Sequence, residues 1–256
     1  MAIIEPVVQG PIVAVTDCPI FSGPLKSERL GATLGVDLGS QDMALAVSRI
    51  NRMPRASVVV TTAARHIIRI SKGGEKIEAI AVYGSKADPT LHPSFREITE
   101  NLRDLRNKWF SKAKLCLILD EPRLEDSELR HVLGIYDRVY LRMEWGTAKT
   151  FAAMTGRKST EFGGYLDNLS HIEHLVVQAR FQRGDVDNST DAEVKAWIKK
   201  IGELKPREIA ILGGDAKGSA KKGKVATKTR LNEIAADVTE KTGIPANVVT
   251  GDSLLA

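Results

Sequence analysis

The sequence has very few cysteines and no long apolar run. Its 256 residues include two cysteines, Cys18 and Cys116, which lie far apart in the chain. A disulfide framework is therefore excluded, and a reducing compartment is the expected environment. No basic stretch followed by an apolar core opens the chain, and no apolar run is long enough to span a bilayer. We therefore expect a cytoplasmic protein without a membrane partner.

A strong excess of charge of one sign is also absent. The net charge is +5, so anionic partners are permitted but not required. The excess is concentrated between Lys217 and Arg230, in a stretch that reads KGSAKKGKVATKTR and contains no aromatic residue. Such a stretch can contact the phosphates of a nucleic acid or capture an anionic metabolite. The interpretation that we favour is a solvated loop.

Short β-favouring runs alternate with amphipathic helical patterns from residue 77 onward. The runs span 77–83, 114–119, 138–141, 174–181 and 208–212, and helical patterns lie between them and after the last one. Strands separated by single helices run parallel with right-handed crossovers. Their unbroken apolar character fits a sheet covered by helices. The alternation by itself allows either a doubly wound sheet or a barrel.

Local signals add detail to this pattern. Thr190 and Glu193 form a capping box, in which both side chains satisfy exposed amides at the start of a helix. The first third of the chain is less regular. Strands are expected at 12–15 and 33–38, a short β-branched one at 58–60, and a helix at 63–70 that ends at Gly73-Gly74.

Residues 23–31 read GPLKSERLG and are followed by LGVD at 34–37. They resemble the G-P-x-x-S-R-R-L-G and L-G-V-D segments of one branch of the radical S-adenosylmethionine (SAM) proteins. Further matches follow in the same order over residues 21–245: Pro89-Thr90-Leu91-His92-Pro93, Gly146-Thr147 with Thr150-Phe151, Asn188, Trp197-Ile198 and Leu204-Lys205-Pro206. The order of these motifs carries the resemblance, because each later one is weak alone.

The resemblance implies an α/β fold, a partial (βα)6 TIM-like barrel of parallel strands. It also implies a ligand site at the carboxyl ends of those strands. With 43% hydrophobic residues, the chain can bury the core of one such domain. We expect a single domain over 1–256, with an N-terminal extension at 1–32 and the partial barrel at 33–250.

The chain departs from the family at the residues that carry its chemistry. The family holds a [4Fe–4S] cluster with C-x-x-x-C-x-x-C after the G-V-D strand. Here residues 39–47 read GSQDMALAV and contain no cysteine, and Met43 is too weak a donor to serve alone. The family's Gly-Gly-Glu edge, which binds the cofactor's amino group, is replaced by Ser85-Lys86-Ala87-Asp88. We therefore expect a degenerate member without an iron–sulfur cluster.

Three functions stay open. The preferred one is a non-catalytic protein that binds a ligand or a partner. The second is an enzyme with cluster-independent chemistry on an anionic substrate, with Lys86, Asp88 and Glu144 as acid–base candidates. The third is an RNA-binding accessory protein that uses the Lys217–Arg230 stretch. We expect no resident cofactor, while residual binding of SAM or another nucleotide stays open.

The loops after the strands are expected to form the mouth of the barrel. Arginines there suit an anionic ligand, but acids and bases mix, and a salt-bridge network around the rim is the favoured alternative. Trp145 is expected to pack under a loop rather than to stack on a base, and Gly213-Gly214 to form a turn rather than a phosphate cradle. The five histidines show no metal-ligand spacing, so no metal site is expected. The candidate binding residues are Lys86, Asp88, Arg142, Glu144, Arg180, Gly213 and Gly214, with Asp120, Glu121, Gln182, Arg183, Asp185, Asp215 and Lys217 nearby.

Overall fold

The structure is a computed structural model that describes residues 20–39, 53–120, 122, 124–213 and 223–250. Its main feature is an eight-stranded sheet in the order β1-β2-β3-β4-β5-β6-β8-β10. Only β1 is antiparallel to its neighbour within this sheet, and each later pair of neighbours is parallel. The strands are β1 (Phe21–Ser27), β2 (Gly31–Asp37), β3 (Ala79–Tyr83), β4 (Lys114–Leu119), β5 (Arg138–Arg142), β6 (Leu175–Ala179), β8 (Glu208–Leu212) and β10 (Ala246–Val249).

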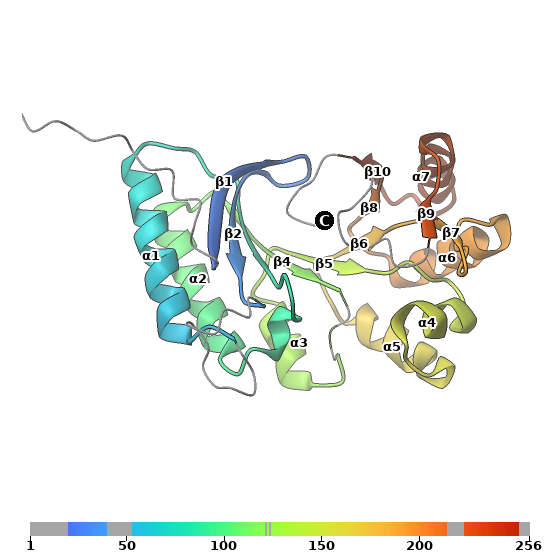
Figure 1. Cartoon of the computed structure of the whole chain (residues 1–256), viewed down its shortest axis with the longest axis horizontal. Coiled ribbons are helices and arrows are strands. Elements are labelled where there is room, and N and C mark those ends of the chain that lie inside the picture. Colours follow the sequence, from blue (N-terminus) through green and yellow to red (C-terminus); the bar gives the residue numbers. More distant parts are fainter. Residues whose placement is uncertain (1–19, 40–52, 121, 123, 214–222, 251–256) are drawn as a thin grey trace, which may run out of the picture.

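Helices connect the parallel strands and cover one face of the sheet. The sheet curls, and the helices follow its outer side (Figure 1). A small second sheet pairs β7 (Gln182–Gly184) with β9 (Gly223–Val225). The helices are α1 (Ala56–Lys72), α2 (Phe95–Trp109), α3 (Ser127–Leu133), α4 (Ala148–Thr155), α5 (Phe162–Ser170), α6 (Asp191–Leu204) and α7 (Lys228–Thr242), with short turns η1 (Pro89–Leu91) and η2 (Ser159–Glu161).

The predicted fold class is confirmed: the chain forms a curled α/β half-barrel of parallel strands. Each strand expected from residue 77 onward is present, and β4 has the predicted bounds. Among the described residues, no helix is both long and apolar enough to cross a membrane.

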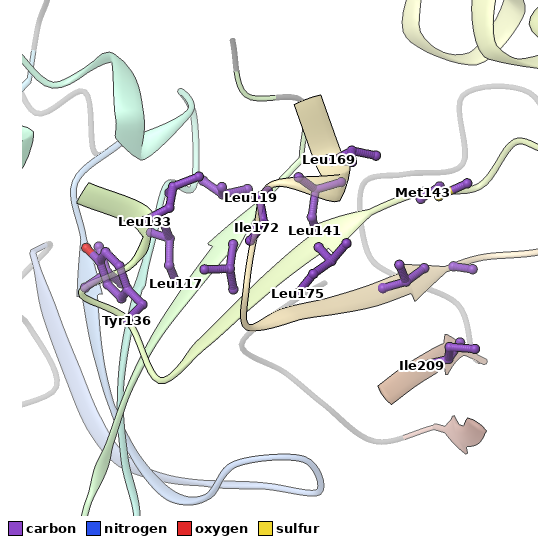
Figure 2. Close-up of a cluster of buried hydrophobic side chains, with 14 of the residues drawn as sticks. Leu117, Leu119, Leu133, Tyr136, Leu141, Met143, Leu169, Ile172, Leu175 and Ile209 are labelled. Carbon is purple, nitrogen blue, oxygen red and sulfur yellow. The ribbon is translucent and has the colours of Figure 1, made fainter. Parts of the chain in front are cut away.

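Alternation along each strand sends side chains to two buried faces. One set, including Leu117, Leu141 and Leu175, points toward the helices and forms the main core (Figure 2). The other set, including Ala81, Cys116 and Tyr140, points into the concave side and forms a smaller cluster. A strand that is buried on both faces has few positions for charge, so polar groups are confined to strand ends.

The structure corrects part of the expectation for the first third of the chain. The β-branched residues 58–60 lie inside α1 and do not form a strand. Val59, Ala63, Ile67 and Ile70 are the buried residues of that helix, at spacings of three and four. This stripe outweighs the strand preference of three valines, since propensity is a weak prior. The expected strand at 12–15 lies outside the described residues.

Several elements were not expected from the sequence. They are the strands β1, β7, β9 and β10, the helix α4 and the short turns η1 and η2. The Gly-Pro-rich segment now forms β1 and the turn to β2, where Ser27 Oγ accepts from the Leu30 amide at 3.1 Å. Gly31 has a φ of 71°, and a Cβ there would lie 1.4 Å from Glu78 Oε2. The Glu78 carboxylate accepts from the Ala32 amide at 2.9 Å, so the side chain that crowds Gly31 also anchors the hairpin.

We expect Ile211 in β8 to be essential to the core, because its side chain is fully buried in the main cluster. Ile211→Val should lower the free energy of unfolding by about 1 kcal/mol through loss of one methylene group. Ile211→Asp should prevent folding, because an unpaired buried charge costs a large share of typical stability. Urea unfolding and soluble expression measure the two effects. Normal folding of Ile211→Asp would contradict the assignment of Ile211 to the buried face of β8.

Candidate functional site

The carboxyl ends of the parallel strands carry a cluster of charged and amide side chains on the concave side. Arg142 ends β5, with Glu144 two residues later, and Gln178 lies in β6, with Arg180 directly after its end. Arg142 lies opposite Gln178 in the β5–β6 register. Asp120, directly after β4, completes the group, which we call the mouth cluster. The structure therefore brings together the predicted Arg142, Glu144 and Arg180.

Arg142 forms ion pairs on both sides. Its Nη2 lies 3.3 Å from Asp120 Oδ1, and its Nε lies 3.5 Å from Glu144 Oε1. The two acids differ in exposure, with 66% for the Asp120 side chain and 15% for that of Glu144. The exposed pair is weak, because water screens it. The favoured alternative of a salt-bridge network therefore has direct geometric support at Arg142.

Burial perturbs Glu144 and Arg180 in opposite directions. It raises the pKa of Glu144, while the positive charges of Arg142 and Arg180 act to lower it. It also lowers the pKa of Arg180, although Glu144 opposes that change. The charge of each group thus offsets part of the cost that burial imposes on the charged form of the other.

Gln178 is the residue of the mouth cluster that sequence reasoning missed. Its side chain is 3% exposed, and its Nε2 has no hydrogen-bond partner among the described residues. A buried amide group without a partner costs free energy, so it marks a site that a ligand can complete. The sequence signal was present, because Gln178 is a polar residue within the apolar run HLVVQARF.

Asn188 fixes the geometry at the ends of β5 and β6. Its Nδ2 donates to the carbonyl oxygens of Glu144 at 2.7 Å and Arg180 at 2.8 Å, and its Oδ1 accepts from the Gln182 amide at 2.7 Å. The side chain is 2% exposed. Asn188 therefore positions the backbone that carries the two charged residues, and it does not face a ligand.

The ends of β2 and β3 are joined through Asp37. Its Oδ1 accepts from the Gly39 amide at 2.9 Å and the Ser85 amide at 3.0 Å, and the residue is 5% exposed. Gly84 permits close contact, since a Cβ there would lie 1.9 Å from the Ala87 carbonyl oxygen. The loop after β3 is thus folded tightly against the end of β2.

Asp88 lies in this loop and caps the η1 turn. Its Oδ1 accepts from the Thr90 amide at 2.8 Å and from the Thr90 hydroxyl. Its Oδ2 is buried, with no hydrogen-bond partner among the described residues. Burial raises the pKa of Asp88, the Thr90 hydrogen bonds oppose this, and the charge of Asp120 adds to it. Asp88 therefore lies within electrostatic reach of the mouth cluster.

The other predicted site residues are placed differently. Lys86 is exposed and forms no ion pair with any residue that the structure describes. The Gly213 amide donates to the Val249 carbonyl at 2.8 Å, so that amide serves the sheet rather than a phosphate. Trp145 is 3% exposed and lies edge-on to Phe151, which matches the expected packing role. Glu121, Gly214, Asp215 and Lys217 lie outside the described residues, and Gln182, Arg183 and Asp185 lie in or directly after β7.

The basic stretch is not one continuous loop. Residues 214–222 lie outside the described part, but Gly223–Val225 form β9 and Lys228 begins α7. Arg230 donates to the Ser189 carbonyl at 3.0 Å and pairs with Asp191. The expected solvated loop is therefore wrong for its last part, because β9 pairs with β7 and Arg230 joins α7 to the start of α6.

The matched motifs have structural roles. A Cβ on Gly146 would lie 2.2 Å from the Trp197 amide nitrogen, so glycine is needed where α6 approaches. Trp197 Nε1 donates to the Met143 carbonyl at 2.9 Å. The role expected of the Glu193 side chain in the capping box is wrong. Its Oε2 accepts from Thr150 Oγ1 at 3.0 Å instead of accepting from the Thr190 amide. The Thr190 half of the capping box is present, with its hydroxyl accepting from the Glu193 amide at 3.4 Å.

Few groups of the described residues suit a metal. No set of three or more His, Cys, Asp and Glu side chains within them is arranged to hold an ion. Cys116 lies inside β4 with 0% exposure, and burial raises the pKa of its thiol to about 12. Such a thiol resists conversion to the thiolate that iron requires. Cys18 lies outside the described residues.

We expect Asp88→Asn to change how stability depends on pH. The raised pKa means that the stabilising contribution of the protonated carboxyl is present at low pH and is lost as pH rises from about 4 through the folded-state pKa. The variant lacks this loss, so its stability relative to the native protein should increase over that window. Urea unfolding at a series of pH values measures the difference.

The control is Asp126→Asn, which changes an exposed cap that accepts from the Glu128 amide at 2.8 Å. Its stability should follow the native protein across the same window. Parallel pH curves for Asp88→Asn and the native protein would contradict the assignment.

Comparisons with known proteins support the fold. No protein-family model matches the sequence, and no curated protein matches it. Similar solved structures include archaeal TYW1 (11% identity, TM-score 0.51, 82% of this chain and 72% of that one). Another is Streptococcus suis SuiB bound to S-adenosylmethionine (13% identity, TM-score 0.52, 75% of this chain and 44% of that one). A domain of pyruvate-formate lyase-activating enzyme from Bacteroides vulgatus ATCC 8482 also matches (10% identity, TM-score 0.43, 60% of this chain and 92% of that one). The chain thus has the curled half-barrel fold of radical SAM-like structures, and the resemblance inferred from the motifs is supported at the level of fold.

Proposed function

We propose that this chain is a binding protein built on the radical SAM-like fold, with no iron–sulfur cluster chemistry. Its ligand is a small molecule with an anionic group, held in the mouth cluster. The observation that carries the proposal is the buried, unpartnered amide of Gln178 directly opposite Arg142. The non-catalytic role is part of the proposal and rests on the donor set described next.

The donor set does not fit a cluster held by three thiolates. The chain contains two cysteines in all, and one of them is Cys116, buried inside a strand. Such a cluster needs thiolate ligands at one place, and the pKa of Cys116 is raised to about 12. No step through a cluster is therefore part of the proposed function.

The geometry favours an acceptor with negative charge. The Gln178 Nε2 group is a donor that lacks an acceptor within the described residues, and Arg142 is a charged donor in the facing position. Asp120 competes for Arg142, but its side chain is 66% exposed and an anionic ligand can displace it at small cost. A carboxylate or phosphate oxygen would then accept from both side chains.

The acids of the mouth limit the affinity. Glu144 and Asp120 offset the charge of Arg142 and Arg180, so the potential over the mouth is modest. Burial favours the neutral form of Glu144, which reduces this repulsion as pH falls. We therefore expect moderate, salt-sensitive binding that strengthens toward acidic pH.

The absence of a cluster is directly testable. Anaerobic reconstitution with iron and sulfide should leave the protein without stoichiometric iron, acid-labile sulfide or visible charge-transfer absorption. The reason is the shortage of thiolates, and Cys116→Ser should give the same result as the native chain. A stoichiometric [4Fe–4S] cluster would overturn the proposed function.

Gln178→Met should separate stability from binding. It removes the unpartnered amide and keeps the side chain's length, so the free energy of unfolding should rise by about 1 kcal/mol. Binding of adenosine 5′-monophosphate, measured by calorimetry, should weaken by about ten-fold because the ligand loses one donor. A fall in stability would show that the native amide has a partner and no ligand role.

Arg142→Gln tests the charged half of the site, with Arg103→Gln as its control. Arg103 is a half-exposed arginine on α2 that pairs with the neighbouring Asp104. Arg142→Gln should weaken adenosine 5′-monophosphate binding by about ten-fold or more, as expected for a charge-assisted hydrogen bond, while the control leaves it unchanged. Equal affinities for the two variants would remove the mouth cluster as the binding site.

A further inference from the structure

A cavity lies at the opposite, amino-terminal end of the sheet. Its volume is about 950 Å³, within the range of small-molecule sites. The β1–β2 turn, the connections that lead into β3 and β4, and the first residues of β4, β5 and β8 line it. The mouth cluster lies at the other ends of the same strands, so this cavity is independent of the proposed function.

Three strands begin with a charged residue at this end. They are Lys114 in β4, Arg138 in β5 and Glu208 in β8. Their register partners are Ala79, Cys116 and Val176, all of the concave cluster. Because neighbours in register share a face, the charged side chains belong to the concave face, and all three line the cavity.

Two acids close to these cations in the sequence and register are already engaged. Asp137, next to Arg138, accepts from Arg106 Nη1 at 2.8 Å and from the Leu115 amide at 2.7 Å. Glu78 accepts from the Ala32 amide at 2.9 Å. Within the described residues, neither Lys114 nor Arg138 forms an ion pair, and Arg138 donates only to the Asp137 carbonyl at 3.2 Å.

The hairpin adds a third cation and an aromatic surface. The Arg29 guanidinium carbon lies 5.6 Å from the centre of the Tyr140 ring, and both residues line the cavity. Trp109 and Phe110 line it from the end of α2. Cationic and aromatic groups thus face one space from four separate segments.

We propose that this cavity binds a small aromatic molecule that carries a phosphate or carboxylate group. Arg138 and Lys114 hold the oxyanion, and Trp109 and Phe110 contact the ring. Glu208, the acid on the concave face, accepts from a hydroxyl or amino group of the ligand. The amino end of such a barrel usually contributes to stability rather than to binding. In a purely stabilising arrangement, however, Lys114 and Arg138 would be expected to form ion pairs, and within the described residues they form none.

Phenyl phosphate is the probe, and tryptophan fluorescence of the full chain is the readout. Trp109 lines the cavity, whereas Trp145 and Trp197 are 3% and 1% exposed, so a change in fluorescence reports on this site. Saturable quenching at millimolar phenyl phosphate is expected. Trp109→Phe should remove the signal while calorimetry still detects binding.

Arg138→Gln and Lys114→Gln should each raise the dissociation constant by about ten-fold. Arg207→Gln is the matched control, because Arg207 is exposed and precedes Glu208 at the same end of the sheet but does not line the cavity. Melting temperatures of all variants establish that each one is folded.

Two results would overturn the proposal. One is the absence of saturable binding of phenyl phosphate to the folded native protein. The other is weakening by Arg207→Gln as large as that by Arg138→Gln, which would place binding elsewhere. If either Arg138→Gln or Lys114→Gln fails to fold, the dissociation constant of the other variant still tests the proposal. Failure of this proposal leaves the mouth cluster untouched, because the two sets of variants share no residue.

Discussion

Burial of the parallel strands on both faces is the constraint on which the rest of this structure depends. Outward residues such as Leu117 pack under the helices, and inward ones such as Ala81 and Tyr140 fill the concave side. A charged side chain in the middle of such a strand would be desolvated without a partner. Charge is therefore confined to the two ends, where the mouth cluster and the amino-end cavity lie.

The mouth cluster combines rigidity with an unsatisfied group. Asn188 fixes the backbone after β5 and β6 through three hydrogen bonds, so Glu144 and Arg180 are held without help from a ligand. Gln178 does not share this support, because its Nε2 has no partner in the described part of the chain. A rigid frame around one costly donor is the arrangement expected of a preorganised binding site, since the frame cannot collapse to satisfy the donor itself.

Sequence reasoning succeeded where one periodic signal dominated and failed where two competed. The bounds of β4 followed from an apolar run between clear breaks, whereas residues 58–60 were misassigned because three valines hid the stripe of α1. The strand β10 was missed, since Gly243 and Pro245 mark the end of a helix but say nothing of the next element. The strand-end positions of Arg142, Glu144 and Arg180 predicted that these residues lie at one end of the sheet, where the structure brings them together. Gln178 and Arg138 were missed because their significance depends on unpaired neighbours, which only the three-dimensional arrangement reveals.

The residues that carry the sequence resemblance make packing contacts that do not depend on a cluster. Gly146 admits α6, and Trp197 binds the Met143 carbonyl. His92 is 3% exposed, and its Nε2 lies 2.6 Å from the Pro54 carbonyl. Each of these contacts serves packing between elements and would be needed whatever the chemistry at the mouth. Cluster ligands have no such second role, because they stabilise the fold only through the metal they hold. The likeness at the glycine, histidine and tryptophan positions therefore bears on the fold and not on cluster chemistry.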